Sequence, residues 1–203
     1  ERDTLALSQH RELNETVRTA ALLSQRVVNL QRALQAGSTL LDPQTLADPD
    51  RLAAFMSSQS VLRGLFASFF VASADGHLSL IADEEGMRTT SINLADREYF
   101  RRTLAEQRAI VSEPVKGRVS GVSVIIFTYP LLAGGKVYGV LAGSLRLASR
   151  GLLDDLVDDV DANGTGLVVV TDSRGLMLAH PDRTRLMRPV TSEPRLALAH
   201  TDW

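Results

Sequence analysis

The sequence contains no cysteine, so disulfide bonds and thiolate chemistry are excluded and the redox compartment stays open. Its apolar runs, such as residues 124–127 and 137–143, are much shorter than the ~20 residues that a membrane helix needs, and its first residues do not form a signal peptide. The sequence begins inside a helical pattern without a cap or a methionine. We therefore expect it to be a segment of a longer protein.

Strong net charge is also absent. The 203 residues carry a formal charge of -2 at pH 7 and have an isoelectric point near 6.1, so the chain has no global attraction to nucleic acid or to anionic lipid. Hydrophobic residues make up 44% of the chain, which is enough to bury one substantial core or two small ones. We expect a globular protein with no nucleic-acid partner.

Patterns of catalytic and metal-binding residues are missing as well. The four histidines lack metal-ligand spacing, and there is neither a Gly-x-Ser-x-Gly motif nor a glycine loop that leads into a helix. Residues 159–164 copy the opening of a calcium loop, but its twelfth position, where a bidentate glutamate is required, is Val170. We expect no catalytic residue, no metal site and no cofactor.

Helical spacing of apolar residues dominates the first part of the sequence. Residues 3–36 contain no proline or glycine, and their apolar positions recur every three, four or seven residues. This pattern predicts a long amphipathic helix. A second helix is expected at about 50–63, with Asp48 or Asp50 as its N-cap.

Strand patterns follow the two helices. Apolar runs bounded by turn residues predict strands at 66–73, 77–83, 109–115, 120–132 and 136–147. After a further helix at 149–160, residues 164–182 repeat the strand, turn and strand of the first hairpin. This order predicts an α+β fold with antiparallel strands, in which a second copy of the module begins near residue 163.

The stretch 96-DREYFRRTL-104 lies in a short helix expected at 96–107 and contains the most distinctive candidate site. Arg97 precedes two adjacent aromatic residues, Tyr99 and Phe100. A guanidinium binds a carboxylate through two parallel hydrogen bonds, and rings beside it exclude water from that contact. The stretch therefore predicts a site for a small carboxylate or a similar small anion.

A structural interpretation of the same stretch stays open. Arg97 can pair with a neighbouring acid such as Glu113, and Asp96 is placed to cap or offset the helix N-terminus. Tyr99 and Phe100 would then pack the helix onto the sheet, and Phe100 is the strongest candidate for plain core.

These features resemble the double Cache family, the extracytoplasmic sensor domains of bacterial transmembrane receptors. The resemblance covers residues 1–182 and also rests on 112-SEPV-115, 128-TYPLLAGGKVYGVLAGSL-145 and 169-VVTDSRGLMLAHPD-182. It implies a long N-terminal helix that emerges from the membrane, then a PAS-like module with a central antiparallel sheet, then a second, smaller or incomplete PAS-like module. The implied divisions are a helical stalk at 1–63, a membrane-distal module at 64–148, a linker helix at 149–162 and a partial membrane-proximal module at 163–203.

The resemblance also implies roles for single residues. In amino-acid-binding members, an arginine two residues before paired aromatics binds the ligand carboxylate, and Arg97, Tyr99 and Phe100 match that motif. The aspartate that binds the ligand amine in those members corresponds to Ser144, and an earlier tyrosine falls near Ile92. The match is therefore partial, and it favours an anion over a zwitterion.

Three further residues complete the candidate ligand site. Arg146 lies two residues after Ser144 on the same strand face and would add a second positive charge. Tyr129, in the long strand expected to face the pocket, is a further candidate hydrogen-bond donor, and Ser112 is a weaker one. The competing interpretations are a surface charge or structural ion pair for Arg146 and ordinary strand packing for Tyr129.

For the whole protein, the resemblance implies an input domain at the periplasmic face of the inner membrane, attached through flanking membrane helices that this chain does not contain. The cytoplasmic output would be a diguanylate cyclase, a histidine kinase or a chemoreceptor domain. The sequence 96-DREYFRR-102 is most like that of the cyclase-linked group. A homodimer through the N-terminal helix is a further expectation. The alternative is a ligand-free module that serves as a spacer, dimerises or binds a protein partner.

Overall fold

The chain begins with helix α1 (Arg2–Ser38), as the apolar spacing predicts. The computed structural model describes residues 2–147 and 167–193. Within these ranges, no helix combines the length and the hydropathy that a membrane crossing requires. The expected helix at 149–160 and the calcium-like stretch at 159–164 lie outside the described residues.

Contacts along the chain define two compact units. The larger unit consists of residues 29–146, and the smaller one combines residues 1–28 with residues 147–203. The last turns of α1 belong to the larger unit, where Leu30 and Leu34 are buried. The start of the PAS-like module at residue 64, as expected from the resemblance, stays a prediction, because the larger unit also includes the helices before that residue.

Three short helices follow α1: α2 (Pro43–Ala47), α3 (Pro49–Ser58) and α4 (Ser60–Leu65). Asp48 caps α3 as expected, because its carboxylate accepts hydrogen bonds from two backbone amides in the first turn. The single helix expected at 50–63 is wrong. It is interrupted at Gln59, whose backbone leaves the helical region with φ -83° and ψ 63°.

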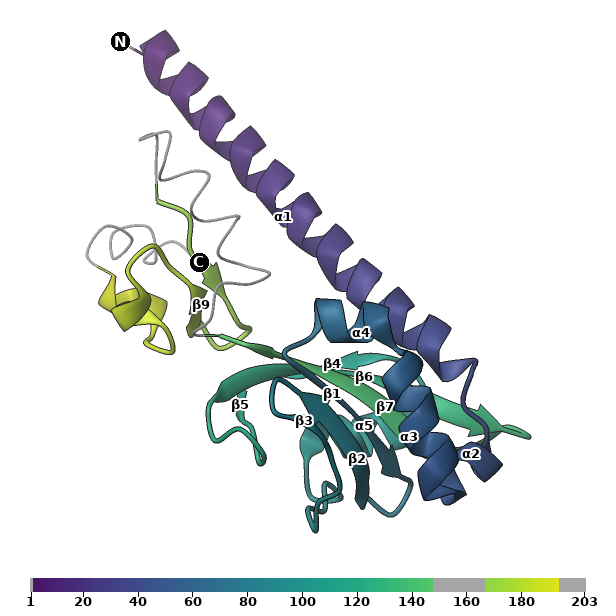
Figure 1. The fold of residues 1–203 in the computed structure, drawn as a ribbon. Coiled ribbons are helices and arrows are strands. Elements are labelled where there is room, and N and C mark those ends of the chain that lie inside the picture. Colours follow the sequence, from purple (N-terminus) through teal and green to yellow (C-terminus); the bar gives the residue numbers. More distant parts are fainter. Residues whose placement is uncertain (1, 148–166, 194–203) are drawn as a thin grey trace. The chain divides into compact units, whose positions relative to one another are not determined.

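The larger unit is built around a seven-stranded antiparallel sheet (Figure 1). Its strands follow the order β3-β2-β1-β7-β6-β4, and β5 also pairs with β6. Helix α5 (Glu98–Glu106) lies between β3 and β4 in the chain. The bounds of the strands are Ser68–Ser73 (β1), Leu78–Asp83 (β2), Gly86–Arg88 (β3), Ile110–Val111 (β4), Val115–Lys116 (β5), Ser123–Ala133 (β6) and Lys136–Arg146 (β7). The expected α+β fold with a central antiparallel sheet is confirmed.

The strand expected at 109–115 is divided into β4 and β5 around Ser112. The Ser112 hydroxyl accepts a hydrogen bond from the backbone amide of Ile126 at 2.9 Å, and the Ser112 amide donates to the Ile126 carbonyl at 2.8 Å. The side chain thus replaces a backbone acceptor just before Pro114, which has no amide hydrogen to continue the ladder.

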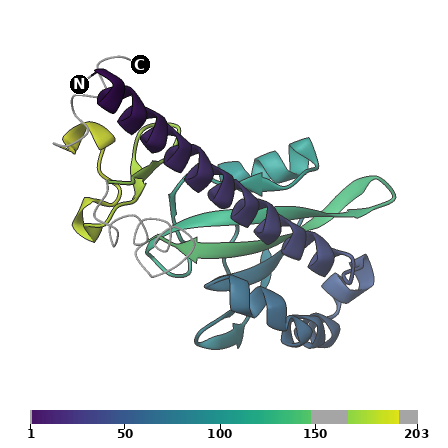
Figure 2. The same ribbon diagram turned by 90° about the horizontal axis from the view of Figure 1, so that it is seen from above.

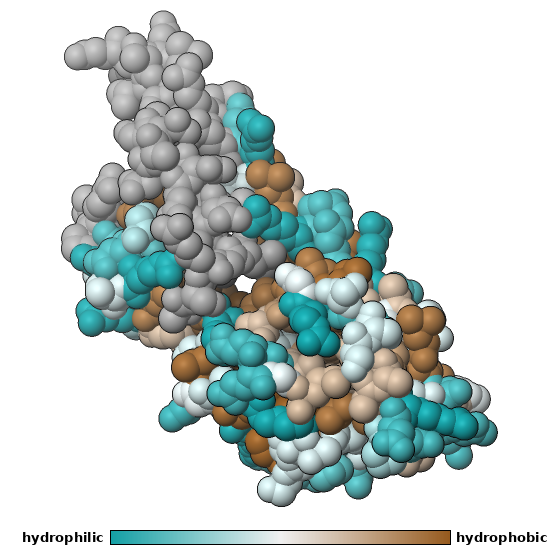
Figure 3. Space-filling view, in the orientation of Figure 1, coloured by the Kyte–Doolittle hydropathy of each residue, from teal (hydrophilic) through white to brown (hydrophobic). Residues whose placement is uncertain are grey.

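Helices cover both faces of this sheet (Figures 1 and 2). The last turn of α1 and helix α4 lie on one face, where Leu62 and Leu141 approach Gly37. Helix α5 packs on the other face, against β6 and β7. The surface in Figure 3 shows apolar and polar side chains intermixed over this unit. The strands are therefore buried from both sides, which explains why their sequences read as continuous apolar runs rather than as a strict alternation.

The smaller unit contains the second hairpin that the sequence predicts at 164–182. Strand β8 (Val170–Thr171) pairs antiparallel with β9 (Met177–Ala179). In its turn, Asp172 accepts hydrogen bonds from two backbone amides, and Gly175 adopts a φ of +75°. The first hairpin turns in the same way at Gly76, whose φ is +90°. Glycine adopts this left-handed conformation without a steric cost.

Buried polar contacts hold the segment that follows β9. It contains two 3-10 helices, Arg183–Arg185 and Val190–Ser192. His180 and Glu193 are both buried, and Nε2 of the histidine lies 3.2 Å from Oε2 of the glutamate. Arg185 pairs with the same glutamate oxygen at 2.8 Å. The buried Glu193 carboxylate is thus compensated by the Arg185 guanidinium.

The packing of Gly143 in β7 generates a first prediction. A Cβ atom at this position would lie directly against the ring of Phe66, which itself packs against Phe127 with ring centroids 6.0 Å apart. We expect Gly143→Ala to lower the free energy of unfolding by about 1–3 kcal/mol, because the ring has to move. Chemical denaturation would measure the difference.

Gly64 offers a matched control for this substitution. It lies in α4, and a Cβ atom there would meet no heavy atom within 4 Å. Gly64→Ala should therefore raise the free energy of unfolding by up to about 1 kcal/mol, since alanine favours a helix over glycine. Equal effects of the two substitutions would contradict the proposed contact between Gly143 and Phe66.

Candidate functional site

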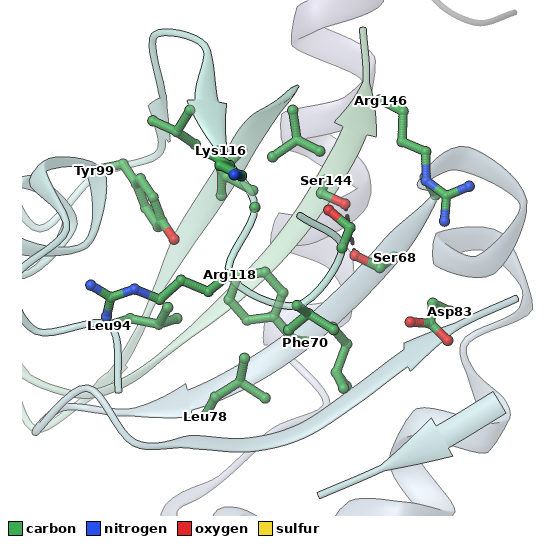
Figure 4. Close-up of a pocket in the computed structure, with 18 residues that line it drawn as sticks. Ser68, Phe70, Leu78, Asp83, Leu94, Tyr99, Lys116, Arg118, Ser144 and Arg146 are labelled. Carbon is green, nitrogen blue, oxygen red and sulfur yellow. Dashed lines mark hydrogen bonds between the residues drawn. The ribbon is translucent and has the colours of Figure 1, made fainter. Parts of the chain in front are cut away.

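A cavity lies on the α5 side of the sheet, within the larger unit (Figure 4). Its volume is about 50 Å³, which is room for a few water molecules or for one small ligand. Apolar side chains of β1, β2 and β6 line it, together with Leu94 and Tyr99 from the segment around the start of α5. The segment 115–120 forms a further wall. The cavity is thus enclosed by apolar side chains with polar groups at a few defined points.

The first of these points is a row of residues that crosses four strands. The antiparallel register aligns Asp83 of β2 with Ser68 of β1, Ser68 with Ser144 of β7, and Ser144 with Ile126 of β6. All four residues line the cavity. The hydroxyl oxygens of Ser68 and Ser144 are 2.7 Å apart, so one hydroxyl donates to the other. The second hydroxyl keeps its hydrogen for a ligand.

Charged groups at one end of the row are paired with one another. Asp83 accepts two hydrogen bonds from Arg88, at 2.8 and 2.7 Å. Arg146 donates to Glu84 at 2.7 Å. The bond from Arg88 holds the pKa of the Asp83 carboxyl below its ordinary value, although burial opposes the shift. Asp83 is therefore an ionised but already neutralised carboxylate.

Tyr99 supplies a polar group on another wall of the cavity. Its side chain is 6% exposed, and its hydroxyl points into the cavity (Figure 4). Within the described part of the chain, this hydroxyl has no hydrogen-bond partner. Burial raises the pKa of Tyr99 above its ordinary value, while the positive charges of Arg97 and Arg118 oppose part of the shift. Near neutral pH, Tyr99 is therefore an uncharged donor or acceptor that is available to a ligand.

Helix α5 holds Tyr99 in place through a buried pair of threonines. The Thr103 hydroxyl donates to the backbone carbonyl of Tyr99 at 2.7 Å, and it lies 2.5 Å from the hydroxyl of Thr128 in β6. Neither threonine is accessible to solvent. Buried hydroxyls that satisfy one another fix the helix on the sheet more strictly than apolar contacts alone.

Arg118 spans the cavity edge between Tyr99 and Leu94 (Figure 4). Its guanidinium donates to the backbone carbonyl of Asn93 and to the carboxylate of Asp96. The arginine comes from a tight turn in which the amide of residue 121 donates to the carbonyl of residue 117 at 2.8 Å. These bonds fasten the wall formed by segment 115–120 to the segment that precedes α5.

The capping role expected for Asp96 at the helix N-terminus is wrong, while the expected charge offset stays a prediction. The N-cap residue of α5 is Arg97, and its side chain forms no capping hydrogen bond. The carboxylate of Asp96 instead binds Arg118, and this contact lowers its pKa. A charged partner at the cavity edge is a stronger attraction than an exposed helix terminus.

Arg97 lies outside the cavity. Its Nη2 donates to the backbone carbonyl of Lys116 at 3.0 Å, and within the described residues it forms no ion pair. Its side chain lines an adjoining groove of about 240 Å³. Tyr99 and Val115 border both the groove and the cavity. The guanidinium expected to bind a carboxylate therefore lies in the adjoining groove and does not line the cavity.

Three other expected site residues also lie away from the cavity. Phe100 is 1% exposed and belongs to the hydrophobic core. Tyr129 lies beside Leu141 in the register, on the sheet face opposite the cavity, because side chains alternate along β6. Ser112 lines the groove beside Arg97, and its oxygen is occupied by the backbone of β6. Ser144, Arg146 and Tyr99 are the expected residues that do line the cavity.

Sequence reasoning missed Ser68, Asp83 and Arg118. Ser68 and Asp83 have no local signal, because only the pairing of β1 with its neighbours brings them to Ser144. Arg118 does have a local signal. The stretch 117-GRVSG-121 places its charged side chain between two glycines, which is typical of a tight turn beside a strand.

Comparison with known proteins agrees with this geometry. A family model described as a Cache domain matches residues 2–198. The chain belongs to the Cache domain family. The suspected double Cache resemblance is thereby confirmed, and the sensor modules of this family are non-catalytic and bind ligands.

Solved structures share this Cache fold. The ligand-binding domain of the Pseudomonas aeruginosa amino acid chemoreceptor PctC, in complex with GABA, is similar at 19% identity over 91% of this chain and 79% of its own, with a TM-score of 0.69. The ligand-binding domain of the Pseudomonas fluorescens chemoreceptor CtaA with L-serine is similar at 18% identity over 94% of this chain and 78% of its own, with a TM-score of 0.63. The ligand-binding domain of Mlp24 with asparagine is similar at 17% identity over 94% of this chain and 77% of its own, with a TM-score of 0.68. At such identities the likeness concerns the fold alone.

The Asp83 carboxylate makes the stability of this Cache domain depend on pH. Its pKa is lowered in the folded state, so the bond to Arg88 stabilises the fold above the unfolded pKa of about 3.9 and is lost as the pH falls through the lower folded value. We expect Asp83→Asn to destabilise the domain at pH 6 and to differ progressively less from wild type below about pH 4. Urea denaturation across this range would measure the difference. A gap that persists unchanged at pH 3 would show that the carboxylate charge is not the cause.

Proposed function

We propose that this Cache domain is the extracytoplasmic input module of a membrane-bound receptor and that it binds a small molecule in the cavity beside Tyr99. The cavity carries this proposal, because it combines an enclosing apolar lining with polar groups that have spare hydrogen-bonding capacity. Sites for small molecules have this composition. The ligand-bound relatives named above support the same use of the fold.

The ligand that suits the cavity is a small carboxylate or a similar small anion. Cations predominate in the lining, which contains Lys116, Arg118 and Arg146 against the single carboxylate of Asp83. That carboxylate is held by Arg88. Asp96 pairs with Arg118 and Glu84 with Arg146 in the same way, so Lys116 is the lining cation without an ion pair among the described residues. A negative charge on the ligand would compensate it, whereas a positive charge would add to it.

Signal transmission follows from the place of such a domain in a receptor. The domain would lie at the periplasmic face of the inner membrane, between two membrane helices, and its output would be a diguanylate cyclase, a histidine kinase or a chemoreceptor domain. A ligand that binds one conformation more tightly shifts the population toward it, and a few kcal/mol of differential affinity is sufficient.

Dimerisation through α1 is part of the same proposal. Val17 and Leu22 on this helix are 60% and 50% exposed, and apolar side chains on a long helix favour a helix partner. Light scattering of the purified domain would give its mass in solution, and a monomer at high concentration would count against a dimer that forms without the rest of the receptor.

A thermal-shift screen tests the proposed function. The compounds are small carboxylates, amino acids, amines and simple anions, and the proteins are wild type, Tyr99→Phe and Tyr129→Phe. We expect at least one compound to stabilise the wild type, with an affinity about 3- to 10-fold weaker in Tyr99→Phe, because one hydrogen bond to the ligand is lost. Tyr129→Phe is the matched control on the opposite face of the sheet, and it should bind like the wild type.

The same screen separates the proposed function from the alternative of a spacer or partner-binding module. If no compound of any class stabilises the wild type, the cavity is not a ligand site and the alternative is preferred. If a compound stabilises all three proteins equally, ligand binding occurs elsewhere in the domain.

A further inference from the structure

Two arginines lie near Tyr99, and they differ in what surrounds them. Arg97 belongs to the groove and is directed to the carbonyl of Lys116. Arg118 lines the cavity itself, and the Tyr99 hydroxyl points toward it (Figure 4). Both positive charges act on the Tyr99 hydroxyl, but of the two only Arg118 is among the residues that line the cavity.

Arg118 is held in position and still has donors to spare. Its two terminal nitrogens bond the Asn93 carbonyl and the Asp96 carboxylate. A guanidinium has five N–H groups, and the remaining ones, including Nε–H, have no partner among the residues that the structure describes. A fork that is fixed by two protein contacts loses little entropy when it binds a ligand.

The cavity also offers nothing to a ligand amine. Its one carboxylate, Asp83, is bound on both oxygens by Arg88. The other polar side chains that line the cavity are the hydroxyls of Tyr99 and Ser120, the linked hydroxyls of Ser68 and Ser144, and the cations Lys116, Arg118 and Arg146. Enclosing an ammonium group without a free carboxylate costs more than its contacts with hydroxyls return.

We infer that Arg118, rather than Arg97, binds the ligand carboxylate together with the Tyr99 hydroxyl, and that the ligand is a small carboxylate without an amino group. This inference rests on the proposed function and makes it more specific. Asp96 and the Asn93 carbonyl position the guanidinium. The linked serines donate one hydrogen bond to the other end of the ligand.

Calorimetric titration with two matched pairs of compounds tests the ligand class. The pairs are butyrate with 4-aminobutyrate, and 3-hydroxypropionate with L-serine; the members of each pair differ only in the amino group. Wild type should bind at least one amino-free member about 10-fold or more tightly than its partner, since the amine has no counter-charge in the cavity. Equal or tighter binding of the amino acids would overturn the inference.

Four variants identify the arginine, each titrated with the tighter-binding compound. Arg118→Ala should weaken binding about 10-fold or more, and Arg118→Lys should restore part of the affinity, because the charge is kept and the fork is lost. Arg97→Ala should change affinity by less than about 3-fold. Arg51→Ala is the matched control. It removes an exposed arginine of α3 that pairs with the N-cap residue Asp48, and it should leave the ligand affinity unchanged.

The outcomes separate this inference from the proposed function. Loss of binding in Arg97→Ala with unchanged binding in Arg118→Ala would overturn the assignment and leave the sensor function intact. Stabilisation of wild type by amines or amino acids alone, with no response to any amino-free carboxylate, would overturn the inferred ligand class and also leave the sensor function intact. If no compound in the broader screen binds at all, the proposed function itself fails. Denaturation of each variant shows whether lost affinity reflects the site or a loss of folding.

Discussion

The candidate site depends first on the antiparallel register of β2, β1, β7 and β6. This register brings Asp83, Ser68, Ser144 and Ile126 into one row, although they are distant in sequence. A shift by one residue in any of these pairings would turn the affected side chains to the opposite face. The polar row would then face the last turn of α1 and helix α4, where Leu62 and Leu141 pack around Gly37.

Packing on the two faces holds this register from both sides. On the helix side, Phe66 lies against Gly143 and allows no larger residue. On the cavity side, α5 is tied to β6 through Thr103 and Thr128, which also fixes Tyr99. One face is close-packed and the other keeps a small space, because the turn from Gly117 to Gly121 stands over the sheet without filling it. The cavity thus depends on the path of the turn that connects β5 with β6.

Local patterns in the sequence were sufficient for the long helix and the hairpins, but they missed the break at Gln59 between α3 and α4 and were insufficient for the site. The long helix, the cap at Asp48 and the hairpin turns at Gly76 and Gly175 depend on neighbouring residues, so they can be predicted from spacing and turn chemistry. The side of the sheet on which Tyr129 lies depends on the register of β6 with β7. Arg97 was the obvious guanidinium in the motif, but the bond of its Nη2 to the Lys116 carbonyl is set by the path of β5.

The charge arrangement explains how one fold serves different ligands. In this domain the cavity lies between the sheet and α5, and side chains supply the polar groups at its edge. Here Ser144 stands in the row where the resemblance predicted an aspartate, and the nearby Asp83 is neutralised by Arg88. Arg118, fastened to Asp96, brings a positive charge to the opposite wall. Both charges are paired within the protein, but Arg118 keeps N–H donors beyond its bonds to Asn93 and Asp96, whereas both oxygens of Asp83 are bonded by Arg88. Under the proposed function, such a cavity would discriminate between ligands by charge, because burying an uncompensated charge costs more than an imperfect apolar contact.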